Sequence, residues 1–250
     1  MKYITSPANK LFKDTKKLLT HSGRVSQGLF IAEGARIANE AVLSGSAEYF
    51  IINESFGEMQ SDIPVYVLSD RLFESISDTK TTQGIAAVCR IQKRNKKEIK
   101  GGMLVACDGV SDPGNLGTII RTAECAGAAG VVLMGNCADP YSPKTVRSTM
   151  GSIFRMPLYY MSAIELSSLP DYTVVAAMTD GATDLYEAEF KANTAMIIGS
   201  EAHGVSREAA SVAHLRVKIP MRGGAESLNA AVAAGVIMYE IARRAGRGVL

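Results

Sequence analysis

Three short polar segments after residue 100 carry residue types that can hold a ligand. Asn115 lies in a polar turn that leads into a predicted helix containing Arg121. Glu201 lies between glycines directly after an apolar run, and Ser227 and Asn229 lie in a glycine-flanked loop. Amide, carboxylate and hydroxyl groups orient a polar ligand, and a guanidinium donates hydrogen bonds to anionic oxygen. These five residues are the first candidates for a binding or catalytic site.

Each of these residues also has a purely structural interpretation. Asn115 can cap the helix that follows it, and Glu201 is an acid favoured by the dipole of a helix start. Arg121 lies about 140° around the predicted helix from Leu116, away from the apolar face, as a surface charge would. Ser227 is a natural N-cap for the predicted helix 230–244. Spacing alone leaves both interpretations open.

The polar segments follow strands of a predicted parallel sheet. Residues 103–107, 131–134, 172–177 and 194–198 are continuous apolar runs separated by helical patterns. Strands without alternation, joined by helices, are typical of a parallel sheet that is buried on both faces. In such sheets ligands bind outside the carboxyl ends of the strands. The loops after these strands are therefore where the chemistry is expected.

The first part of the chain predicts a smaller α/β unit. The segment 92–102 then holds five basic residues and ends in two glycines, which is typical of a linker. We predict a small N-terminal domain at 1–95, a basic linker at 96–102 and a second domain at 103–250. The elements expected in the first domain are helices at 8–20, at 34–44 and from Asp70 onward, with strands at 28–32, 48–52, 64–68 and 84–91.

Composition narrows the class of protein. The formal net charge is +2, and 47% of the residues are hydrophobic, which fits an ordered globular protein. The sequence contains no run of about 18 apolar residues, so no transmembrane helix is predicted. No signal peptide is recognisable at the start. The four cysteines form no CxxC pair and the three histidines are scattered, so no metal site is expected. These features predict a cytoplasmic protein without membrane partners.

Basic residues concentrate in the first part of the chain and in one later segment. Residues 1–100 hold fifteen Lys or Arg against eleven Asp or Glu. Such clusters either neutralise the phosphates of a nucleic acid or form solvated surface. The candidates for RNA contact are Lys10, Lys13, Lys16, Lys17, Arg24, Lys144, Arg147 and Arg155.

The polar segments together resemble the motifs of the SpoU (TrmH-like) branch of the SPOUT RNA methyltransferases. Asn115-x-Gly117-x-x-x-Arg121-x-Ala123 looks like the first family motif, and Gly199-x-Glu201-x-x-Gly204 looks like the second. Ser227-Leu228-Asn229, after Ile219-Pro220-Met221, looks like the third. The resemblance covers about residues 103–245, and all three motifs occur in order. The segment 28–34 resembles the family's RNA substrate-binding domain.

The resemblance implies a fold and an activity that the spacing does not show. The second domain would be a parallel sheet with a C-terminal trefoil knot, active as a homodimer. The reaction would be methylation of a ribose 2′-hydroxyl, with Arg121 stabilising the developing alkoxide or orienting the adjacent phosphate. Asn115, Glu201, Ser227 and Asn229 would position Arg121 and the ribose. The residues implied to bind S-adenosylmethionine are Met178, Thr179, Gly199, Glu201, Gly204, Ile219, Met221, Ser227 and Leu228.

Several alternatives stay open. Ribosomal RNA, and within it 23S rRNA, is the preferred substrate, because an additional N-terminal domain suggests a structured target; transfer RNA is the second candidate. A catalytically silent RNA-binding protein of the same fold is possible, but the complete set of polar motif residues argues against it. A nucleotide-dependent oxidoreductase is disfavoured because the chain has no GxGxxG fingerprint after a strand.

Overall fold

The computed structural model describes residues 1–180 and 183–245. The last residues of the predicted second domain, 246–250, lie outside the described residues. Contacts divide the chain into two compact units, which are described separately below. Unit 1 consists of Met1–Gln92 and Asp139–Arg155, and unit 2 of Lys93–Ala138 and the chain from Met156 onward.

The segment Asp139–Arg155 is an unexpected part of unit 1. It lies inside the range 103–250 that the sequence assigned to the second domain, yet it packs with the N-terminal residues. The ring of Phe30 lies 5.0 Å from the ring of Tyr141 and 5.9 Å from that of Phe154. All three side chains are buried, so the segment completes the apolar core of unit 1.

Unit 2 is built on a seven-stranded sheet in the order β10-β12-β9-β11-β6-β7-β8, and every neighbouring pair is parallel. The central strands consist of buried apolar residues, as predicted for a sheet covered on both faces. The strands are β6 (Leu104–Asp108), β7 (Gly130–Met134), β8 (Leu158–Tyr160), β9 (Thr173–Ala177), β10 (Thr183–Asp184), β11 (Thr194–Gly199) and β12 (Leu215–Lys218).

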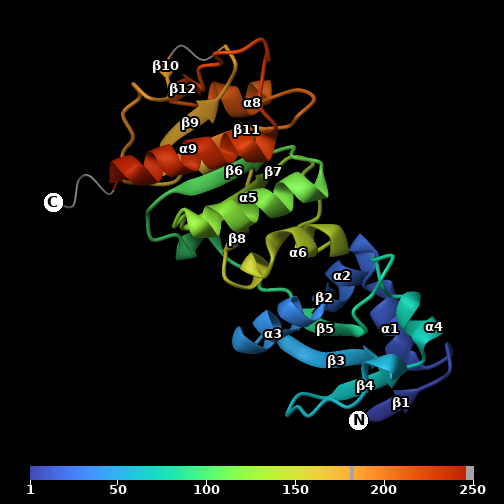
Figure 1. The fold of residues 1–250 in the computed structure, drawn as a ribbon. Coiled ribbons are helices and arrows are strands. Elements are labelled where there is room, and N and C mark those ends of the chain that lie inside the picture. The colour runs from blue at the N-terminus through green and yellow to red at the C-terminus, as the bar shows by residue number, and fades with distance from the viewer. Residues whose placement is uncertain (181–182, 246–250) are drawn as a thin grey trace. The chain divides into compact units, whose positions relative to one another are not determined.

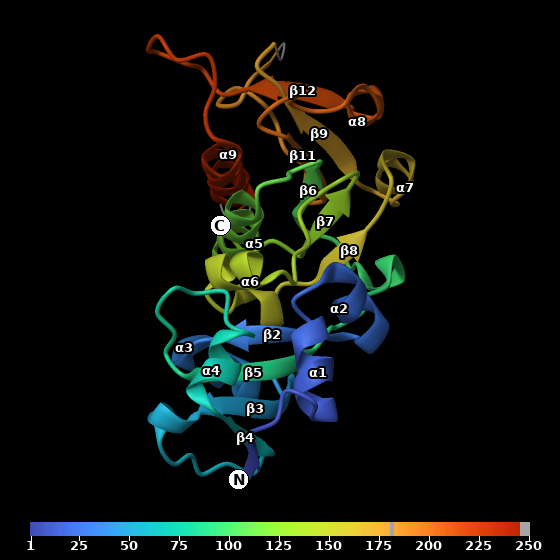
Figure 2. The same ribbon diagram turned by 90° about the vertical axis from the view of Figure 1, so that its right-hand side faces the viewer.

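Helices cover both faces of this sheet. The helices α5 (Pro113–Cys125) and α9 (Ala230–Ala245) pack against each other on one face, and α7 (Ala163–Ser167) and α8 (Arg207–Ser211) lie on the other (Figure 2). A short 3-10 helix, η2 (Lys96–Glu98), lies in the predicted linker. The prediction of a parallel α/β architecture is confirmed. Strands β8, β10 and β12 were not predicted, because they have two to four residues each.

Unit 1 contains a mixed five-stranded sheet in the order β1-β4-β3-β5-β2 (Figure 1). Helices α1 and α4 contribute Phe12 and Phe73 to a core that includes Ile51 and Val88 of the sheet. The strands are β1 (Lys2–Ile4), β2 (Leu29–Glu33), β3 (Ala47–Asn53), β4 (Val65–Leu68) and β5 (Ile85–Arg90). The helices are α1 (Lys10–Lys17), α2 (His21–Gln27), α3 (Ala35–Leu43), α4 (Asp70–Glu74) and α6 (Pro143–Thr149), with 3-10 turns η1 (Glu54–Phe56) and η3 (Ser152–Phe154).

The predicted helix at 8–20 ends earlier in the structure and is followed by a separate helix. The side chain of Thr20 caps α2 by accepting a hydrogen bond from the Gly23 amide at 3.1 Å. A side chain at Gly23 would meet the Lys17 carbonyl oxygen at 1.9 Å, so this tight turn requires glycine. Apolar spacing alone does not reveal this local cap.

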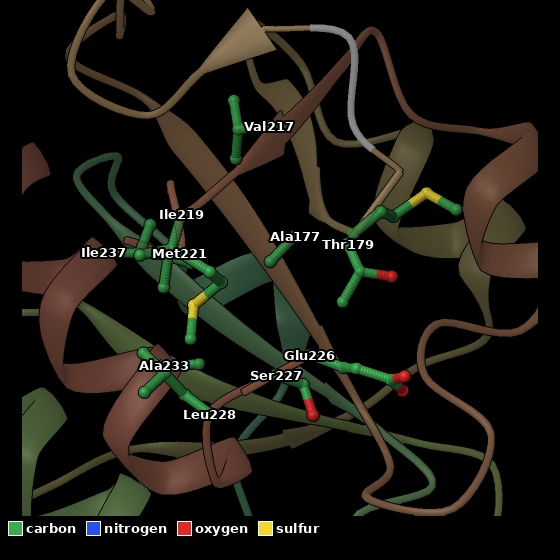
Figure 3. Close-up of a pocket in the computed structure, with 11 residues that line it drawn as sticks. Ala177, Thr179, Val217, Ile219, Met221, Glu226, Ser227, Leu228, Ala233 and Ile237 are labelled. Atoms are coloured by element: carbon green, nitrogen blue, oxygen red, sulfur yellow. The ribbon is translucent and has the colours of Figure 1, made fainter. Parts of the chain in front are cut away.

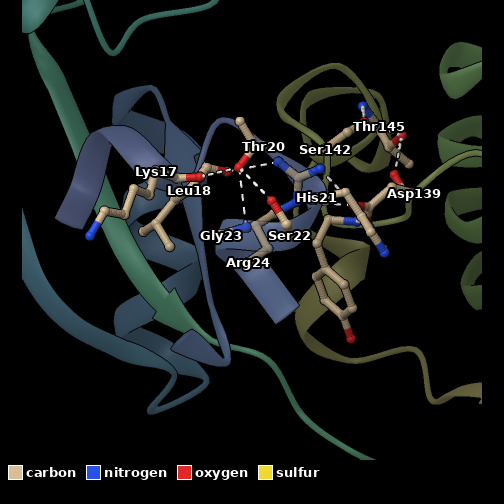
Figure 4. Close-up of polar contacts among 11 residues, drawn as sticks. Lys17, Leu18, Thr20, His21, Ser22, Gly23, Arg24, Asp139, Ser142 and Thr145 are labelled. Carbon is tan, nitrogen blue, oxygen red and sulfur yellow. Dashed lines mark hydrogen bonds and ion pairs between the residues drawn. The ribbon is translucent and has the colours of Figure 1, made fainter. Parts of the chain in front are cut away.

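A buried ion pair joins α2 to the segment Asp139–Arg155 (Figure 4). The Arg24 Nη2 donates to Asp139 Oδ2 at 2.6 Å, and its Nη1 donates to the Leu18 carbonyl at 2.7 Å. His21 Nδ1 lies 2.7 Å from the same Asp139 oxygen. Burial raises the pKa of Asp139, but the hydrogen bonds from His21, Arg24 and the Tyr141 amide outweigh it and lower this pKa. Asp139 therefore stabilises unit 1 in its ionised form.

Replacing Asp139 with Ala should destabilise the protein by about 3 kcal/mol, because it leaves the Arg24 guanidinium buried without its counter-charge. Calorimetric unfolding of the full chain measures this. The matched control is Asp14→Ala, which removes an exposed pair with Lys17 and should change little. Because the pKa of Asp139 is lowered by folding, its contribution is complete above about pH 4 and is lost as the pH falls further. Equal melting temperatures for both variants would contradict the structural role.

Among residues 1–180 and 183–245, no helix is long and apolar enough to cross a membrane. The described residues also contain no group of three or more His, Cys, Asp or Glu side chains that could hold a metal ion. The four cysteines are free thiols. Burial raises the pKa of both Cys107 and Cys137, so these two groups near the end of β6 stay protonated at neutral pH.

Candidate functional site

The first motif begins where β6 ends. Asp112 caps α5, because its Oδ1 accepts a hydrogen bond from the Asn115 amide at 2.8 Å. Pro113 occupies the first turn, where its missing N–H costs nothing. The interpretation of Asn115 as the cap is therefore wrong. Since Asp112 satisfies the helix end, the Asn115 side chain is available for other contacts.

Asn115 links the three predicted motifs. Its Nδ2 donates to Glu201 Oε1, and its Oδ1 accepts from Asn229 Nδ2 at 3.0 Å. These two bonds determine the orientation of the Asn115 amide, because the Glu201 carboxylate can only accept a hydrogen bond and the Asn229 Nδ2 can only donate one. Three loops that are far apart in the sequence thus form one hydrogen-bonded chain at the surface of unit 2.

Asn229 also begins helix α9. Its Oδ1 accepts from the Ala231 amide at 2.9 Å and from the Val232 amide at 3.3 Å. The prediction that Ser227 is the N-cap is wrong: α9 starts at Ala230, three residues after Ser227. One amide side chain therefore holds the helix with its oxygen and the first motif with its nitrogen.

The loop that carries Glu201 closes tightly on the end of β11. Ser200 and Gly204 exchange backbone hydrogen bonds of 3.1 and 2.9 Å. A side chain at Gly199 would meet the backbone of Gly204 at 2.0 Å, so the close approach requires glycine there. The role found for Gly199 and Gly204 in the structure is thus to shape the loop.

Asp108 anchors the far end of this loop and was not recognised from the sequence. It is the last residue of β6, it is buried, and its Oδ2 accepts a hydrogen bond from the Ser206 amide at 2.6 Å. Asp108 pairs with Gly199 across the two parallel strands. A signal was available in retrospect, since an acidic residue at the end of an otherwise apolar strand needs a partner.

A cleft that is open to solvent lies at the carboxyl ends of β9 and β12 (Figure 3). Six of the predicted cofactor residues line it, whereas Gly199, Glu201 and Gly204 are not among its lining residues. The six are Met178, Thr179, Ile219, Met221, Ser227 and Leu228, and Ala177, Val217, Glu226, Ala233 and Ile237 complete the lining. A mostly apolar cleft with a few polar groups is typical of a site for a nucleoside-sized ligand.

The cleft and the hydrogen-bonded chain share one loop. Ser227 and Leu228 line the cleft, and the next residue is Asn229, which bonds to Asn115. Arg121 lies on the same helix as Asn115, is exposed, and makes no hydrogen bond or ion pair to any other residue in the described part of the chain. The structure thus leaves the Arg121 guanidinium available for a ligand.

The predicted RNA-contact residues differ in their surroundings. Arg24 is 5% exposed in its side chain and bonds inside unit 1, so it does not present its charge to solvent. Arg147 pairs with Asp78 at 2.7 Å, and Arg155 pairs with Glu40. Lys10, Lys13, Lys16, Lys17 and Lys144 are exposed or half-exposed, and of these Lys17 pairs with Asp14.

The sheet and the cleft define an α/β protein that binds a nucleoside-sized ligand at the carboxyl ends of its strands. Comparison with known proteins makes this more specific. The model of the SpoU rRNA Methylase family matches residues 102–239, and that of the MRM3-like substrate binding domain matches residues 9–87.

Individual relatives agree with the family models. The 23S rRNA (guanosine(2553)-2′-O)-methyltransferase RlmP of Bacillus subtilis is 34% identical, over 96% of this chain and 99% of its own length. The AdoMet-bound rRNA methyltransferase from Sinorhizobium meliloti has a TM-score of 0.85 and 31% identity, covering 98% of each chain. The SpoU methyltransferase AviRb from Streptomyces viridochromogenes, in complex with AdoMet, has a TM-score of 0.85 and 27% identity, covering 95% of this chain and 98% of that one.

The chain belongs to the SpoU rRNA methylase family. The resemblance inferred from the three motifs is confirmed, as is the SPOUT type of fold. The trefoil knot stays a prediction.

Asp108 should matter for the site through the Ser206 amide. Replacing Asp108 with Ala leaves this N–H without its acceptor and should destabilise the protein by about 1–3 kcal/mol while weakening ligand binding in the cleft. Asp108→Asn keeps an oxygen acceptor and should stay close to wild type. Thermal unfolding and S-adenosylhomocysteine titration measure both effects.

The control for this prediction is Ser206→Ala. It removes the hydroxyl that caps α8 by accepting from the Ala209 amide, but it keeps the backbone N–H that bonds to Asp108. If Asp108→Asn lost as much affinity as Asp108→Ala, the hydrogen-bond role assigned to Asp108 would be wrong.

Proposed function

We propose that this protein is an S-adenosylmethionine-dependent methyltransferase that acts on a ribose 2′-hydroxyl of ribosomal RNA, with 23S rRNA as the first candidate. The observation that carries the proposal is the continuity of the cleft with the hydrogen-bonded motif chain through Ser227, Leu228 and Asn229. A ligand in the cleft would present its reactive end to the side chains of the three motifs. The 23S rRNA 2′-O-methyltransferase RlmP and the AdoMet-bound methyltransferase structures, to which this chain is similar, support this choice.

The lining of the cleft suits this cofactor better than a dinucleotide. Among the described residues no Lys or Arg lines it, so the cleft offers no cationic side chain to pair with a pyrophosphate. Its apolar side chains, among them Ile219, Met221 and Ile237, can enclose an uncharged adenosine. This observation disfavours the oxidoreductase alternative.

The reaction requires the 2′-oxygen to attack a methyl carbon in line with the bond that breaks. Bound S-adenosylmethionine supplies an electrophilic methyl group. Arg121 would stabilise the negative charge that develops on the ribose oxygen or hold the neighbouring phosphate, since its guanidinium stays protonated. The hydroxyl proton would leave to a neighbouring group or to water. Asn115, Glu201 and Asn229 would hold the ribose relative to Arg121, and Ser227 would contact the cofactor from the cleft wall.

The experiment that tests the proposed function is label transfer. The full-length protein is incubated with methyl-labelled S-adenosylmethionine and either unmodified ribosomal RNA or transfer RNA, and the RNA is digested to nucleosides. Label in 2′-O-methylated nucleosides from ribosomal RNA supports the proposal. Label only in transfer RNA would support the second substrate candidate. No transfer to either RNA with S-adenosylhomocysteine still bound would mean that a substrate or partner is missing. No transfer together with no binding of S-adenosylhomocysteine would favour the silent RNA-binding protein.

Arg121 is the residue whose loss should affect turnover most selectively. Arg121→Ala should lower the rate of methyl transfer by about 100-fold or more, because it removes stabilisation of the transition state. Cofactor affinity should change less than about twofold, since Arg121 does not line the cleft. Arg121→Lys retains the charge without the planar fork and should be intermediate. Near-normal turnover in Arg121→Ala would exclude it from the mechanism.

Unit 1 would supply RNA affinity through the exposed basic face of α1. Lys10 and Lys13 lie one turn apart, are exposed, and form no direct hydrogen bond or ion pair with another described residue. Lys144 would add to the basic surface of unit 1. The ion pairs of Arg147 and Arg155 would have to open before these side chains could contact RNA; otherwise the two residues only stabilise the fold. Arg24 is left out because it is buried.

Replacing Lys10 and Lys13 together with Ala should weaken RNA binding regardless of sequence. The slope of log affinity against log salt should become shallower by about 1 to 2, as expected when one or two phosphate contacts are lost. Filter binding at several salt concentrations measures this. Lys191→Ala, an exposed lysine of unit 2 outside the proposed set, serves as the control. An unchanged slope in the double variant would remove α1 from the RNA surface.

We also propose a homodimer in the cytoplasm. Val232 and Tyr239 of α9 lie on one helical stripe and are 52% and 55% exposed, and no part of the described chain covers them. An exposed apolar stripe on a helix is typical of a subunit contact. Light scattering of the full-length protein decides between a dimer and a monomer.

A further inference from the structure

The cofactor cleft contains a single charged side chain. Of the eleven residues that line it, Glu226 is the only one with an ionisable carboxylate, and the other ten are apolar or carry a hydroxyl. Glu226 was not among the residues expected to bind the cofactor. It lies directly before Ser227, a residue of the third motif that was expected to bind the cofactor.

No cation in the described part of the chain neutralises this carboxylate. Among residues 1–180 and 183–245, no Lys, Arg or His forms an ion pair with Glu226, and none lines the cleft. Figure 3 shows Glu226 and Thr179 on the same side of the cleft, whereas Met221, Leu228 and Ile237 form an apolar wall opposite them. The carboxylate is exposed at the open cleft, so solvent partly screens its field, but the apolar wall supplies no charge that would offset it.

This arrangement favours a ligand with a positive charge. S-adenosylmethionine carries a sulfonium, an ammonium and a carboxylate, and therefore has a net charge of about +1 at neutral pH. Methyl transfer converts the sulfonium into a neutral thioether, so the product S-adenosylhomocysteine has no net charge. A carboxylate at the cleft stabilises the first molecule more than the second.

Resting on the proposed function, we infer that Glu226 is a specificity-determining residue that makes the cleft bind the cationic methyl donor more tightly than the neutral product. The residue thereby helps the spent cofactor to leave after each turnover. This preference for the cationic ligand requires no contact between Glu226 and RNA and no proton transfer by Glu226. It requires only that the negative charge lie close enough to the cleft to act on the sulfonium.

The test compares three ligands on the full-length protein by titration calorimetry. S-adenosylmethionine and sinefungin are cationic at the position of the sulfonium, and S-adenosylhomocysteine is neutral there. Glu226→Gln removes the charge but keeps the size of the side chain. It should weaken binding of both cationic ligands about tenfold and change binding of S-adenosylhomocysteine less than about twofold.

Two further variants separate charge from structure. Glu226→Asp retains the carboxylate and should restore most of the preference for the cationic ligands. Glu208→Gln removes an exposed carboxylate of α8 that does not line the cleft, and should leave all three affinities unchanged. The wild-type preference should also shrink in high salt, because exposed charges are screened.

The outcomes are distinct. An equal loss for all three ligands in Glu226→Gln would show a structural role, and no loss for any ligand would show that the charge does not reach the cofactor; either result overturns the inference while leaving the methyltransferase proposal intact. If the wild-type protein bound none of the three ligands, both the inference and the proposed function would fail.

Discussion

The parallel pairing of β6 with β11 is the constraint on which the site depends. Its register places Asp108 beside Gly199, so two loops that start some ninety residues apart leave the sheet at the same edge. A shift by one residue would turn the Asp108 side chain to the opposite face and break its bond to the Ser206 amide. Glu201 would then lose its place beside Asn115. The accuracy of the site thus depends on backbone hydrogen bonds in the centre of the sheet.

The sequence was informative where a local pattern and a general rule of sheet geometry coincide. Asn115, Glu201 and Asn229 each lie in a loop of the predicted parallel sheet. Loops that follow the carboxyl ends of parallel strands lie at the same edge of the sheet, so these residues are predicted to lie close together. Their finer roles were assigned less well. Asp112 rather than Asn115 caps α5, and Asn229 rather than Ser227 caps α9. Both errors have one cause: Asp, Asn and Ser can all cap a helix, and only the start of the first turn decides which of them does so.

Residues with distant partners could not be assigned from the sequence. Arg24 belongs to a basic stretch and looks like a surface charge, but its partner Asp139 is more than a hundred positions away. Asp108 and Glu226 were overlooked because each is a single acidic residue in a loop or at a strand end. The apolar residues before Asp108 signal that it needs a partner, but only the structure identifies this partner as the Ser206 amide. Only the structure shows that Glu226 lines a cleft whose other lining residues are uncharged. Contacts between residues that are distant in the sequence arise from tertiary structure and produce no periodic pattern in the sequence.

The inclusion of Asp139–Arg155 in unit 1 has a consequence for synthesis of the protein on the ribosome. The first 92 residues emerge before their core is complete, because Tyr141 and Phe154, which pack on Phe30, and Asp139, which neutralises Arg24, are translated later. By then β6 and β7 of unit 2 have already been made. The N-terminal unit therefore cannot complete its core when its first 92 residues have emerged, but only once residue 155 has been made. Strands β9, β11 and β12 of unit 2 are translated after that point, so unit 1 can still finish folding before unit 2. A fragment that ends at residue 92 would carry an exposed apolar surface and an uncompensated guanidinium.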